Sequence, residues 1–328
     1  MPLYSTACPL PINRKIFRHR VSFSPTDLTG LSLWLKGDAG VTTSTVTPTY
    51  ISQIVISGAG ESTSNGTYVR SSGGNTTFYS GSNAIQGGGA NWLLYDDSFG
   101  DTTYENTNSL EQNSWTEYNA TGAPSAVNTT SSGTPYTGVT AWADQSGNSR
   151  DGTADNGYPA LISNALNGKP AIEFNGADAR ITGSEPTTSL PVTVIIVAKH
   201  LADTEIGMMY EQFADGDNMA FYRWTSGGQL RIYNGIDLTG ETIVPFSFKI
   251  FGAIINETDS EIYINGSFDN SGDSGDFTPS GNYYLAHWAG GDTYTNMQIA
   301  EVVVYNRAIT TPERQQVEAY LNSKYAIY

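Results

Sequence analysis

From Val139 to Tyr305 the chain is a succession of short strand-like segments separated by turn residues. Two segments, TVIIVA and FGAII, are continuously apolar, whereas EIYING alternates apolar with polar residues. Continuous apolar runs are typical of central strands packed on both faces, and alternation indicates a strand with one wet face. Asn175-Gly176 and Asn265-Gly266 are signals for tight hairpin turns. About nine such strands with turns between them predict two stacked antiparallel sheets, so the expected fold class is an all-β sandwich.

One convincing helix follows the last strand. Thr310 or Thr311 can serve as its N-cap, and Pro312 falls in its first turn. Glu313 can answer Thr310 as a capping box. Apolar side chains then recur at helical spacing, namely Val317, Tyr320, Leu321 and Tyr325. We therefore expect a C-terminal helix that lies with this stripe against the sandwich and covers an edge.

Residues 50–137 differ in character from the chain on either side. They are rich in Gly, Ser, Thr and Asn, and Arg70 is their only basic residue. Short strand-like pieces such as GTYVRS and NWLLYD recur between Gly and Asn punctuation, as expected for a small antiparallel meander. We therefore predict a small β-rich module inserted into a loop of a sandwich made of residues 25–49 and 138–328.

Residues 1–24 form a basic, proline-containing arm with no acidic residue before Asp27, although the chain as a whole has a formal net charge of −16. One interpretation is an edge strand with solvated Arg side chains, because apolar and basic residues alternate near its end. The other is an anchor that docks onto an acidic partner while the acidic body faces outward. The candidate partner-binding residues are Arg14, Lys15, Phe17, Arg18 and Arg20.

The acidic balance argues against nucleic acid or an anionic membrane as the main partner, because both would repel the protein. Cys8 is the only cysteine, so no intrachain disulfide can form. We find no secretory signal pattern and no apolar stretch long enough to span a bilayer. We therefore expect synthesis in a cytosol and, if the protein acts outside a cell, release by another route.

Four stretches, taken in order, resemble the concanavalin A-like (laminin-G-like) lectin/glucanase superfamily. They are LSLWLKGDAGV (31–41), VTAWADQSGNSRDGTA (139–154), PALISNALNGKPAIEFNGADARI (159–181) and IAEVVVYNRAITTPERQQVEAYLNSKY (299–325). The resemblance implies an antiparallel jelly-roll sandwich, a fold that hosts many functions. In the turn DQSGNSRDG, Asp144 can cap and Gly147 and Asn148 can adopt positive φ. The insertion lies outside the resemblance and is similar to small Gly/Tyr/Trp-rich modules of phage structural proteins.

Members of this superfamily that cleave glucans carry paired acids in a pattern like E-x-D-x-x-E, which places two carboxylates at the distance that glycoside hydrolysis requires. This chain has no such run, and Glu173 and Glu261 stand alone in their segments. The histidines, His19, His200 and His287, have no neighbouring Ser/Asp partner that would suggest a triad. The sequence therefore predicts that the protein is not an enzyme.

Some laminin-G-like domains hold calcium through loop oxygens, so calcium is a candidate cofactor. The candidate ligands are Asp144, Asp178, Asp269, Asp273 and Asp276. The alternative is that these acidic, Gly-rich loops are simply solvated, because no complete calcium-loop motif is present.

Glycan binding is the commonest recognition role of the superfamily, and loop aromatics could stack on sugar faces. The candidate contacts are Trp224, Trp288, Tyr294 and Trp115, although such residues are more often core or rim packing.

These features together favour a non-enzymatic surface protein of a bacteriophage virion, such as a capsid decoration, head-fibre or tail-associated protein. Its basic arm would bind other virion structural proteins, its sandwich would display a lectin-like surface to host glycans, and lysis would release it. A homo-oligomer is compatible with this role, although no heptad stretch would drive one. The alternatives are a carbohydrate-binding adhesin not tied to a virion and, with less support, a glycan hydrolase.

Overall fold

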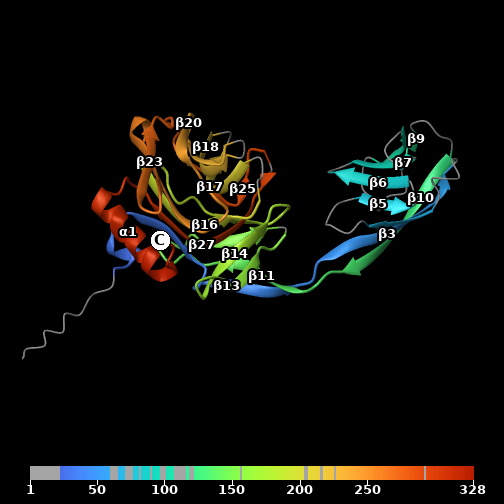
Figure 1. The fold of residues 1–328 in the computed structure, drawn as a ribbon, viewed down its shortest axis with the longest axis horizontal. Coiled ribbons are helices and arrows are strands. Elements are labelled where there is room, and N and C mark those ends of the chain that lie inside the picture. The colour runs from blue at the N-terminus through green and yellow to red at the C-terminus, as the bar shows by residue number, and fades with distance from the viewer. Residues whose placement is uncertain are drawn as a thin grey trace, which may run out of the picture. The chain divides into compact units, whose positions relative to one another are not determined.

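The computed structural model describes residues 23–59, 66–70, 77–80, 83–88, 91–96, 101–106, 116–117, 122–155, 157–202, 206–214, 217–224, 227–291 and 293–328 (Figure 1). The chain divides into two compact units, of which one is Thr45–Thr137 and the other comprises the chain on either side of it. The insertion predicted at residues 50–137 falls within the unit Thr45–Thr137. The predicted anchor residues Arg14, Lys15, Phe17, Arg18 and Arg20 lie outside the described residues.

The larger unit contains a helix-side sheet centred on strand β27, Asn296–Tyr305. On one edge β27 pairs with β16, Val192–His200. On its other edge it pairs with β1, Leu31–Lys36, and with β14, Lys169–Asn175. Beyond β16 the sheet continues through three more antiparallel strands, β21 (Lys249–Ile255), β22 (Ser260–Ile264) and β23 (Ser267–Gly272).

A second antiparallel sheet faces the first across the core. In spatial order its strands are β12 (Gly152–Asp155), β15 (Arg180–Gly183), β24 (Asn282–Leu285), β17 (Ile206–Ala214), β18 (Asp217–Trp224), β19 (Gln229–Tyr233) and β20 (Asp237–Ile243). The remaining strands of this unit are β2 (Val41–Val46), β11 (Tyr136–Trp142), β13 (Ala160–Leu166), β25 (His287–Trp288) and β26 (Thr293–Tyr294). Pairings of β11 with β2, β12 and β13 link the edges of the two sheets.

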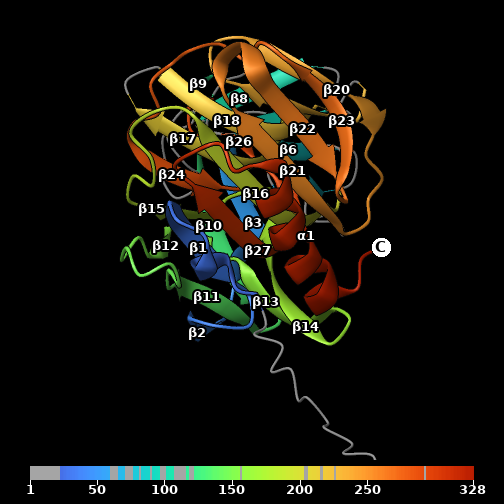
Figure 2. The same cartoon turned by 90° about the vertical axis from the view of Figure 1, so that its left-hand side faces the viewer.

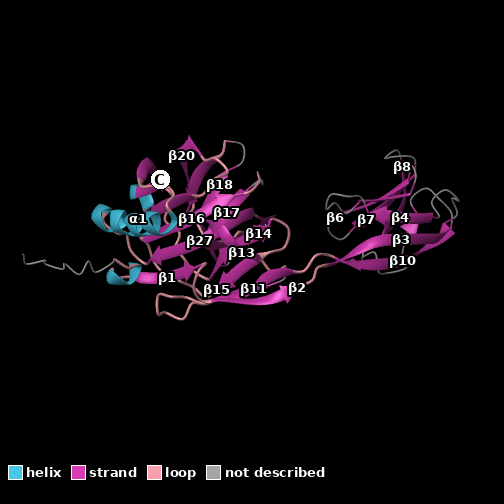
Figure 3. Ribbon diagram, turned by 60° about the horizontal axis from the view of Figure 1, so that its bottom comes forward, coloured by secondary structure: helices cyan, strands magenta, loops and turns pink. Residues whose placement is uncertain are grey.

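The main core lies between the two sheets, and strand alternation explains its composition. Val194 and Ile196 of β16 point into this core, whereas Ile195 and Val197 point to the opposite face, and all four are fully buried. Because both faces of β16 are covered, its sequence is continuously apolar, as expected for a central strand. The described fold is mostly antiparallel β with a single C-terminal α-helix, so the predicted all-β sandwich is confirmed (Figure 3).

Helix α1, Thr311–Tyr325, covers the outer face of the helix-side sheet (Figure 2). Thr310 is its N-cap, and the Glu313 carboxylate accepts the Thr310 backbone N–H at 2.7 Å, as the predicted capping box requires. Val317, Leu321 and Tyr325 are fully buried in the cluster beneath the helix. The predicted helix and its apolar stripe are therefore confirmed.

The predicted hairpin at Asn175-Gly176 is wrong: these residues lead from β14 to β15, which belong to different sheets and pair with other strands. Gly176 has a positive φ of 70°, and Asn175 Oδ1 accepts the N–H groups of the three residues that follow Gly176, so this is a turn between the sheets.

The other two turns follow their sequence signals more closely. Asn265 and Gly266 adopt φ of 51° and 79° between β22 and β23, as a two-residue hairpin requires. In the turn after β11, Gly147 has the expected positive φ of 88°, but the second left-handed residue is Ser149 at 58°. The sequence predicted Asn148, not Ser149, as this second residue with positive φ. The Asn148 side chain instead donates hydrogen bonds to the carbonyl oxygens of Leu31 and Ser32, which tie the turn to β1.

The smaller unit contains one antiparallel eight-stranded sheet in the order β10-β3-β4-β5-β6-β7-β8-β9. Its strands are β3 (Thr49–Ala59), β4 (Gly66–Arg70), β5 (Thr77–Ser80), β6 (Asn83–Gly88), β7 (Asn91–Asp96), β8 (Asp101–Asn106), β9 (Thr116–Glu117) and β10 (Gly122–Ser132). Ile54, Ile56 and Tyr68 are its described buried side chains. The meander expected from the Gly- and Asn-punctuated sequence is therefore the architecture of this unit.

Two short 3-10 helices, Pro25–Asp27 and Glu257–Asp259, complete the described elements. Within the described residues, no helix has both the length and the apolar character needed to cross a bilayer.

Candidate functional site

The outer face of the second sheet carries apolar side chains that do not belong to the main core. Met208 of β17 lies directly opposite Tyr222 of β18, and Ala220 of β18 lies opposite Tyr233 of β19. Met208, Ala220 and Tyr222 form a small buried cluster of their own, against which Ile206, Trp224, Tyr233 and Trp288 pack. An outer sheet face with its own apolar cluster is a candidate binding surface, because outward strand positions are usually polar.

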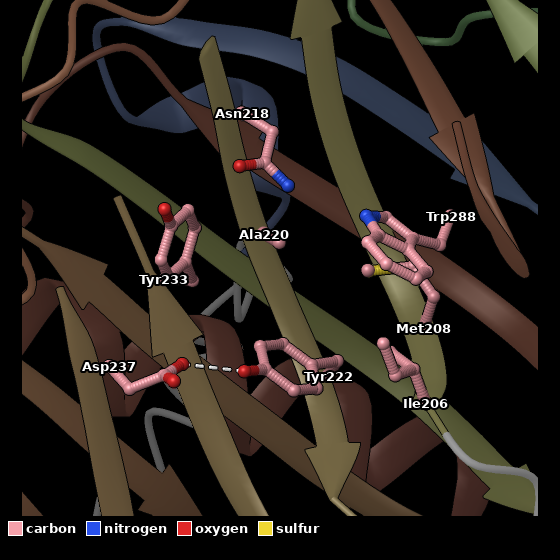
Figure 4. Close-up of a pocket in the computed structure, with 8 residues that line it drawn as sticks. All are labelled: Ile206, Met208, Asn218, Ala220, Tyr222, Tyr233, Asp237 and Trp288. Atoms are coloured by element: carbon pink, nitrogen blue, oxygen red, sulfur yellow. Dashed lines mark hydrogen bonds between the residues drawn. The ribbon is translucent and has the colours of Figure 1, made fainter. Parts of the chain in front are cut away.

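A cavity of about 210 Å³ opens on this face (Figure 4). It is lined by Ile206, Met208, Asn218, Ala220, Tyr222, Tyr233, Asp237 and Trp288. Ala220 sits among much larger side chains, so its single methyl group leaves the space that the others surround. Trp288 comes from β25 rather than from the sheet itself, and Figure 4 shows its indole beside Met208. Four adjacent strands and one separate hairpin therefore build the site together.

The polar end of the cavity is organised by Asp237, the first residue of β20. Its Oδ1 accepts the Tyr222 hydroxyl at 2.5 Å, and its Oδ2 lies 3.4 Å from Arg231 Nη1. Burial, followed by the hydrogen bond to Asp237, raises the pKa of Tyr222 well above its usual value, so the phenol stays protonated and donates. The Arg231 guanidinium in turn lies 4.5 Å from the centre of the Trp224 ring, a cation–π contact.

The wall opposite Asp237 is held by Glu211 of β17, which is fully buried. Its Oε1 accepts Asn218 Nδ2 at 3.0 Å, and its Oε2 accepts the backbone N–H of Ala289 at 2.6 Å. Burial raises the pKa of Glu211, and these two hydrogen bonds lower it only in part. Glu211 therefore connects Asn218, which lines the cavity, to the residue that follows Trp288.

The four predicted glycan contacts have different positions. Trp288 lines the cavity, and Trp224 packs beside it with its ring edge-on to Tyr222 at 6.4 Å. Tyr294, in the strand paired with β25, lies 4.6 Å from the ring of His287 and outside the cavity lining. Trp115 lies outside the described residues. The structure thus brings Trp224 and Trp288 together although they are far apart in sequence.

Sequence reasoning missed the residues that accompany these tryptophans, chiefly Asn218, Tyr222 and Asp237. One signal was available: in NMAFYRW, alternate positions place Asn218, Ala220, Tyr222 and Trp224 on one face of a strand. No comparable signal identifies Asp237, because it joins the site only through the pairing of β19 with β20.

The candidate calcium ligands lie in separate turns, and several use their oxygens for backbone hydrogen bonds. Asp144 accepts the N–H groups of Trp34, Ser146 and Arg150. Asp269 accepts the N–H groups of Glu241 and Thr242 at 3.1 and 3.0 Å, which caps the edge of β20. A carboxylate engaged in this way has a structural role that accounts for its presence without an ion.

The other three candidates are more exposed. Asp178 accepts Asn175 Nδ2 at 2.7 Å, Asp273 accepts the Gly275 N–H at 2.8 Å, and Asp276 lies on the surface. Among the described residues, no three His, Cys, Asp or Glu side chains are grouped as a metal site would require. Calcium binding stays a prediction, and melting the protein with calcium and with a chelator would test it.

The side chains considered for catalysis are engaged with their neighbours. Glu173 accepts a hydrogen bond from Gln298, and Glu261 accepts one from Tyr263 at 2.6 Å. His200 Nε2 lies 3.0 Å from the Gly207 carbonyl oxygen, and His287 Nε2 lies 3.2 Å from Arg180 Nη1. His19 lies outside the described residues.

Comparisons with known proteins find likenesses in structure only. No family model matches the chain, and no curated protein matches it. Domain 4 of an extracellular arabinanase from Geobacillus stearothermophilus, in complex with arabinotriose, is 19% identical with a TM-score of 0.45, over 54% of this chain and 91% of that one. Trypanosoma rangeli sialidase with the inhibitor DANA is 12% identical with a TM-score of 0.43, over 55% of this chain and 30% of the sialidase.

The receptor-binding domain of botulinum neurotoxin type G is similarly distant, at 12% identity and a TM-score of 0.43 over 56% of this chain and 48% of that domain. The match spans less than a third of the sialidase. The similar structures are mainly glycosidases, and this contradicts the prediction that the chain is not an enzyme. The missing paired-acid run does not exclude catalysis, because acids on different strands can meet in space. We do not retain that prediction, and likeness at this level assigns no activity either.

Proposed function

We propose that the larger unit is a carbohydrate-binding domain of the concanavalin A-like type and that the cavity over Ala220 is its sugar site. One observation carries the proposal: Trp288, Tyr222 and Tyr233 surround a hollow whose polar groups include Asp237 and Asn218. A sugar ring has an apolar C–H face and a rim of hydroxyl groups. Aromatic side chains suit the former, and carboxylate and amide groups suit the latter.

The dimensions favour a single sugar ring. Pockets for drug-sized ligands measure about 300–1,000 Å³, whereas this cavity measures about 210 Å³. A terminal residue of a glycan can enter such a space while the rest of the glycan extends outside. Trp224 and its Arg231 partner lie next to the cavity and supply further contact area for that extension.

A glycan array probed with the full chain tests this proposal. Ala220→Phe should fill the hollow, and Trp288→Ala should remove its wall, so each should weaken binding roughly tenfold or more. Phe268→Ala is the matched control, because Phe268 is an exposed aromatic residue outside the cavity lining. Equal binding by all of these proteins would contradict the proposed site. Reducing-sugar release measured on the bound glycans shows whether binding is accompanied by cleavage.

We also propose that the protein works on the surface of a bacteriophage particle, where residues 1–24 anchor it to other virion proteins. The support is the contrast between this basic segment and the net charge of −16 for the whole chain. Deleting residues 1–24 should abolish incorporation into particles and leave glycan binding unchanged. Unchanged incorporation would contradict the anchor. The alternative, an adhesin not tied to a virion, predicts glycan binding without particle association.

A further inference from the structure

We infer that the cavity selects an uncharged sugar, whose hydroxyl groups donate to Asp237, and that it excludes sugars bearing a carboxylate. This inference rests on the proposed sugar site and names the chemical class of its ligand. It follows from the hydrogen-bonding capacity and the charge of the groups that face the cavity.

Asp237 is the group that sets the pattern. Ionised carboxylates only accept hydrogen bonds, with about four lone-pair positions over two oxygens. In Asp237 one position on Oδ1 is used by the Tyr222 hydroxyl and one on Oδ2 faces Arg231. The Asp237 side chain is 42% exposed, so its remaining positions are accessible to a ligand. A ligand must therefore present donors here, and adjacent sugar hydroxyls are suitable donors.

The polar groups near Asp237 are already engaged with one another, and the one nearby cation, Arg231, faces the Asp237 carboxylate. The Tyr222 hydroxyl already donates to Asp237, and one N–H of Asn218 is committed to Glu211. Within the part of the chain that the structure describes, the residues lining the cavity include a carboxylate and neither Lys nor Arg. Arg231 lies opposite Tyr222 in the pairing of β18 with β19, beside the cavity rather than in its lining. Its guanidinium lies against the Trp224 ring and 3.4 Å from Asp237 Oδ2, so that carboxylate already compensates its charge.

A sugar carboxylate in this cavity would lie close to Asp237 in a partly dehydrated space, where repulsion between like charges is stronger than in water. The net charge of −16 adds a weaker, salt-dependent repulsion during approach. Like-charge juxtaposition is a common means of rejecting a wrong ligand. Neutral sugars avoid both penalties and gain the charge-assisted hydrogen bonds that Asp237 offers.

The test is an array of matched pairs: gluco-, galacto- and manno-oligosaccharides, and the same chains ending in the corresponding uronic acid or in sialic acid. We expect the unmodified protein to bind at least one neutral chain roughly tenfold or more tightly than its acidic counterpart. This comparison needs no variant, so it does not depend on how any substitution folds. Stronger or equal binding of the acidic chains would overturn the inference and leave the proposed sugar site standing.

Asp237→Asn then assigns the discrimination to this side chain. The Asn side chain has the same shape and keeps one oxygen that can accept the Tyr222 hydroxyl. The variant should bind neutral sugars several-fold more weakly, and the ratio of its affinities for neutral and acidic sugars should be smaller than in the natural protein. Asp276→Asn is the matched control, because it makes the same change in net charge at an exposed position outside the cavity. If both variants showed the same ratio of neutral to acidic affinity, Asp237 would not be the residue that discriminates. Failure of every protein to bind any sugar would overturn the proposed site itself, and this inference with it.

Discussion

Two carboxylates of the second sheet differ in exposure, and their roles differ accordingly. Asp237 lines the cavity and has accessible oxygens. Glu211 is fully buried, and its two oxygens accept hydrogen bonds from Asn218 and from the Ala289 backbone N–H. A buried carboxylate that accepts two hydrogen bonds holds two chain segments at a defined separation. We therefore assign Glu211 the positioning of the β25–β26 hairpin, which carries Trp288.

Replacing Glu211 with Ala should release that hairpin from β17. We expect faster hydrogen exchange at the Ala289 amide, with exchange along the β17–β18 ladder unchanged. The free energy of unfolding should fall by about 1 kcal/mol or more, because the part-buried Ala289 N–H and Asn218 both lose an acceptor. Glu211→Gln, which keeps an acceptor oxygen, is the matched control and should restore protection at Ala289. Equal exchange in all three proteins would contradict the positioning role.

Glu211 should also leave a signature in the pH dependence of stability. Its folded-state pKa is raised above the value of 4.5 for an unperturbed Glu, so the folded protein favours the protonated acid. Its ionisation therefore lowers the stability as the pH rises from 4.5 through the raised pKa. Urea unfolding across this pH range should show that the free energy of unfolding of Glu211→Gln rises relative to that of the natural protein as the pH increases. If the difference in free energy between the two proteins did not change with pH, the assigned pKa shift of Glu211 would be contradicted.

At the scale of elements, helix α1 is attached to the sandwich by apolar packing and by one buried acid. Glu301 of β27 is fully buried and accepts hydrogen bonds from Trp34 Nε1, Tyr320, Lys324 and Tyr325. These donors come from β1 and α1, so a single carboxylate joins three elements. Lys324 also contacts Asp38 at 2.7 Å, nearer the surface.

Glu301→Gln should be strongly destabilising, because it leaves the nearly buried Lys324 without its deeper partner. Breaking a buried ion pair costs about 3–5 kcal/mol. Asp38→Asn removes the more exposed partner of the same lysine and should cost about 1 kcal/mol or less. Urea denaturation of both variants measures the difference. Equal losses would show that Glu301 contributes no more than a surface pair.

The N-terminus of α1 predicts a second, opposite pH effect. The Arg307 side chain, followed by the Thr310 backbone N–H, lowers the pKa of Glu313 to about 2. Because this folded-state value lies below 4.5, the stabilisation is complete above pH 4.5 and is lost as the pH falls towards 2. Glu313→Ala should cost about 1 kcal/mol at neutral pH, as loss of a cap does, and less in acid. Thermal unfolding over this pH range checks both statements, and a constant difference would refute them.

At the scale of the whole molecule, the chain consists of two units, each with its own strands and buried side chains. The chain leaves the larger unit at β2 and returns at β11, which pair with each other. Near this exit, the Thr140 hydroxyl donates to the Thr42 carbonyl oxygen at 3.2 Å. The two ends are thus close enough for a short turn to join them.

Replacing residues 45–137 with an Asn-Gly turn should therefore leave a folded larger unit, because that turn suits two paired antiparallel strands. The shortened protein should unfold in one cooperative transition and bind the same glycans as the full chain. Circular dichroism, urea unfolding and the glycan array check this. Loss of cooperativity would show that the larger unit depends on the smaller one.

Features that depend on neighbours in the sequence could be predicted from it. The apolar run of β16 and the Thr310–Glu313 capping box act over a few residues, so periodicity and spacing locate them. The twisted turn at Asn265-Gly266 is likewise a local conformational preference. The fold class follows from these signals because alternating and continuous apolar strands can bury their faces only by stacking sheets.

The composition of the site was decided by the tertiary structure. Trp224 and Trp288 could be proposed as contacts, but only strand register places them with Tyr222 and Asp237 around Ala220. Likewise, only the tertiary structure places Asp269 of β23 beside β20, where its carboxylate accepts the N–H groups of Glu241 and Thr242. Short-range patterns specify which face of a strand is apolar. Which strands become neighbours is determined by packing between residues far apart in the chain, and no local pattern encodes that pairing.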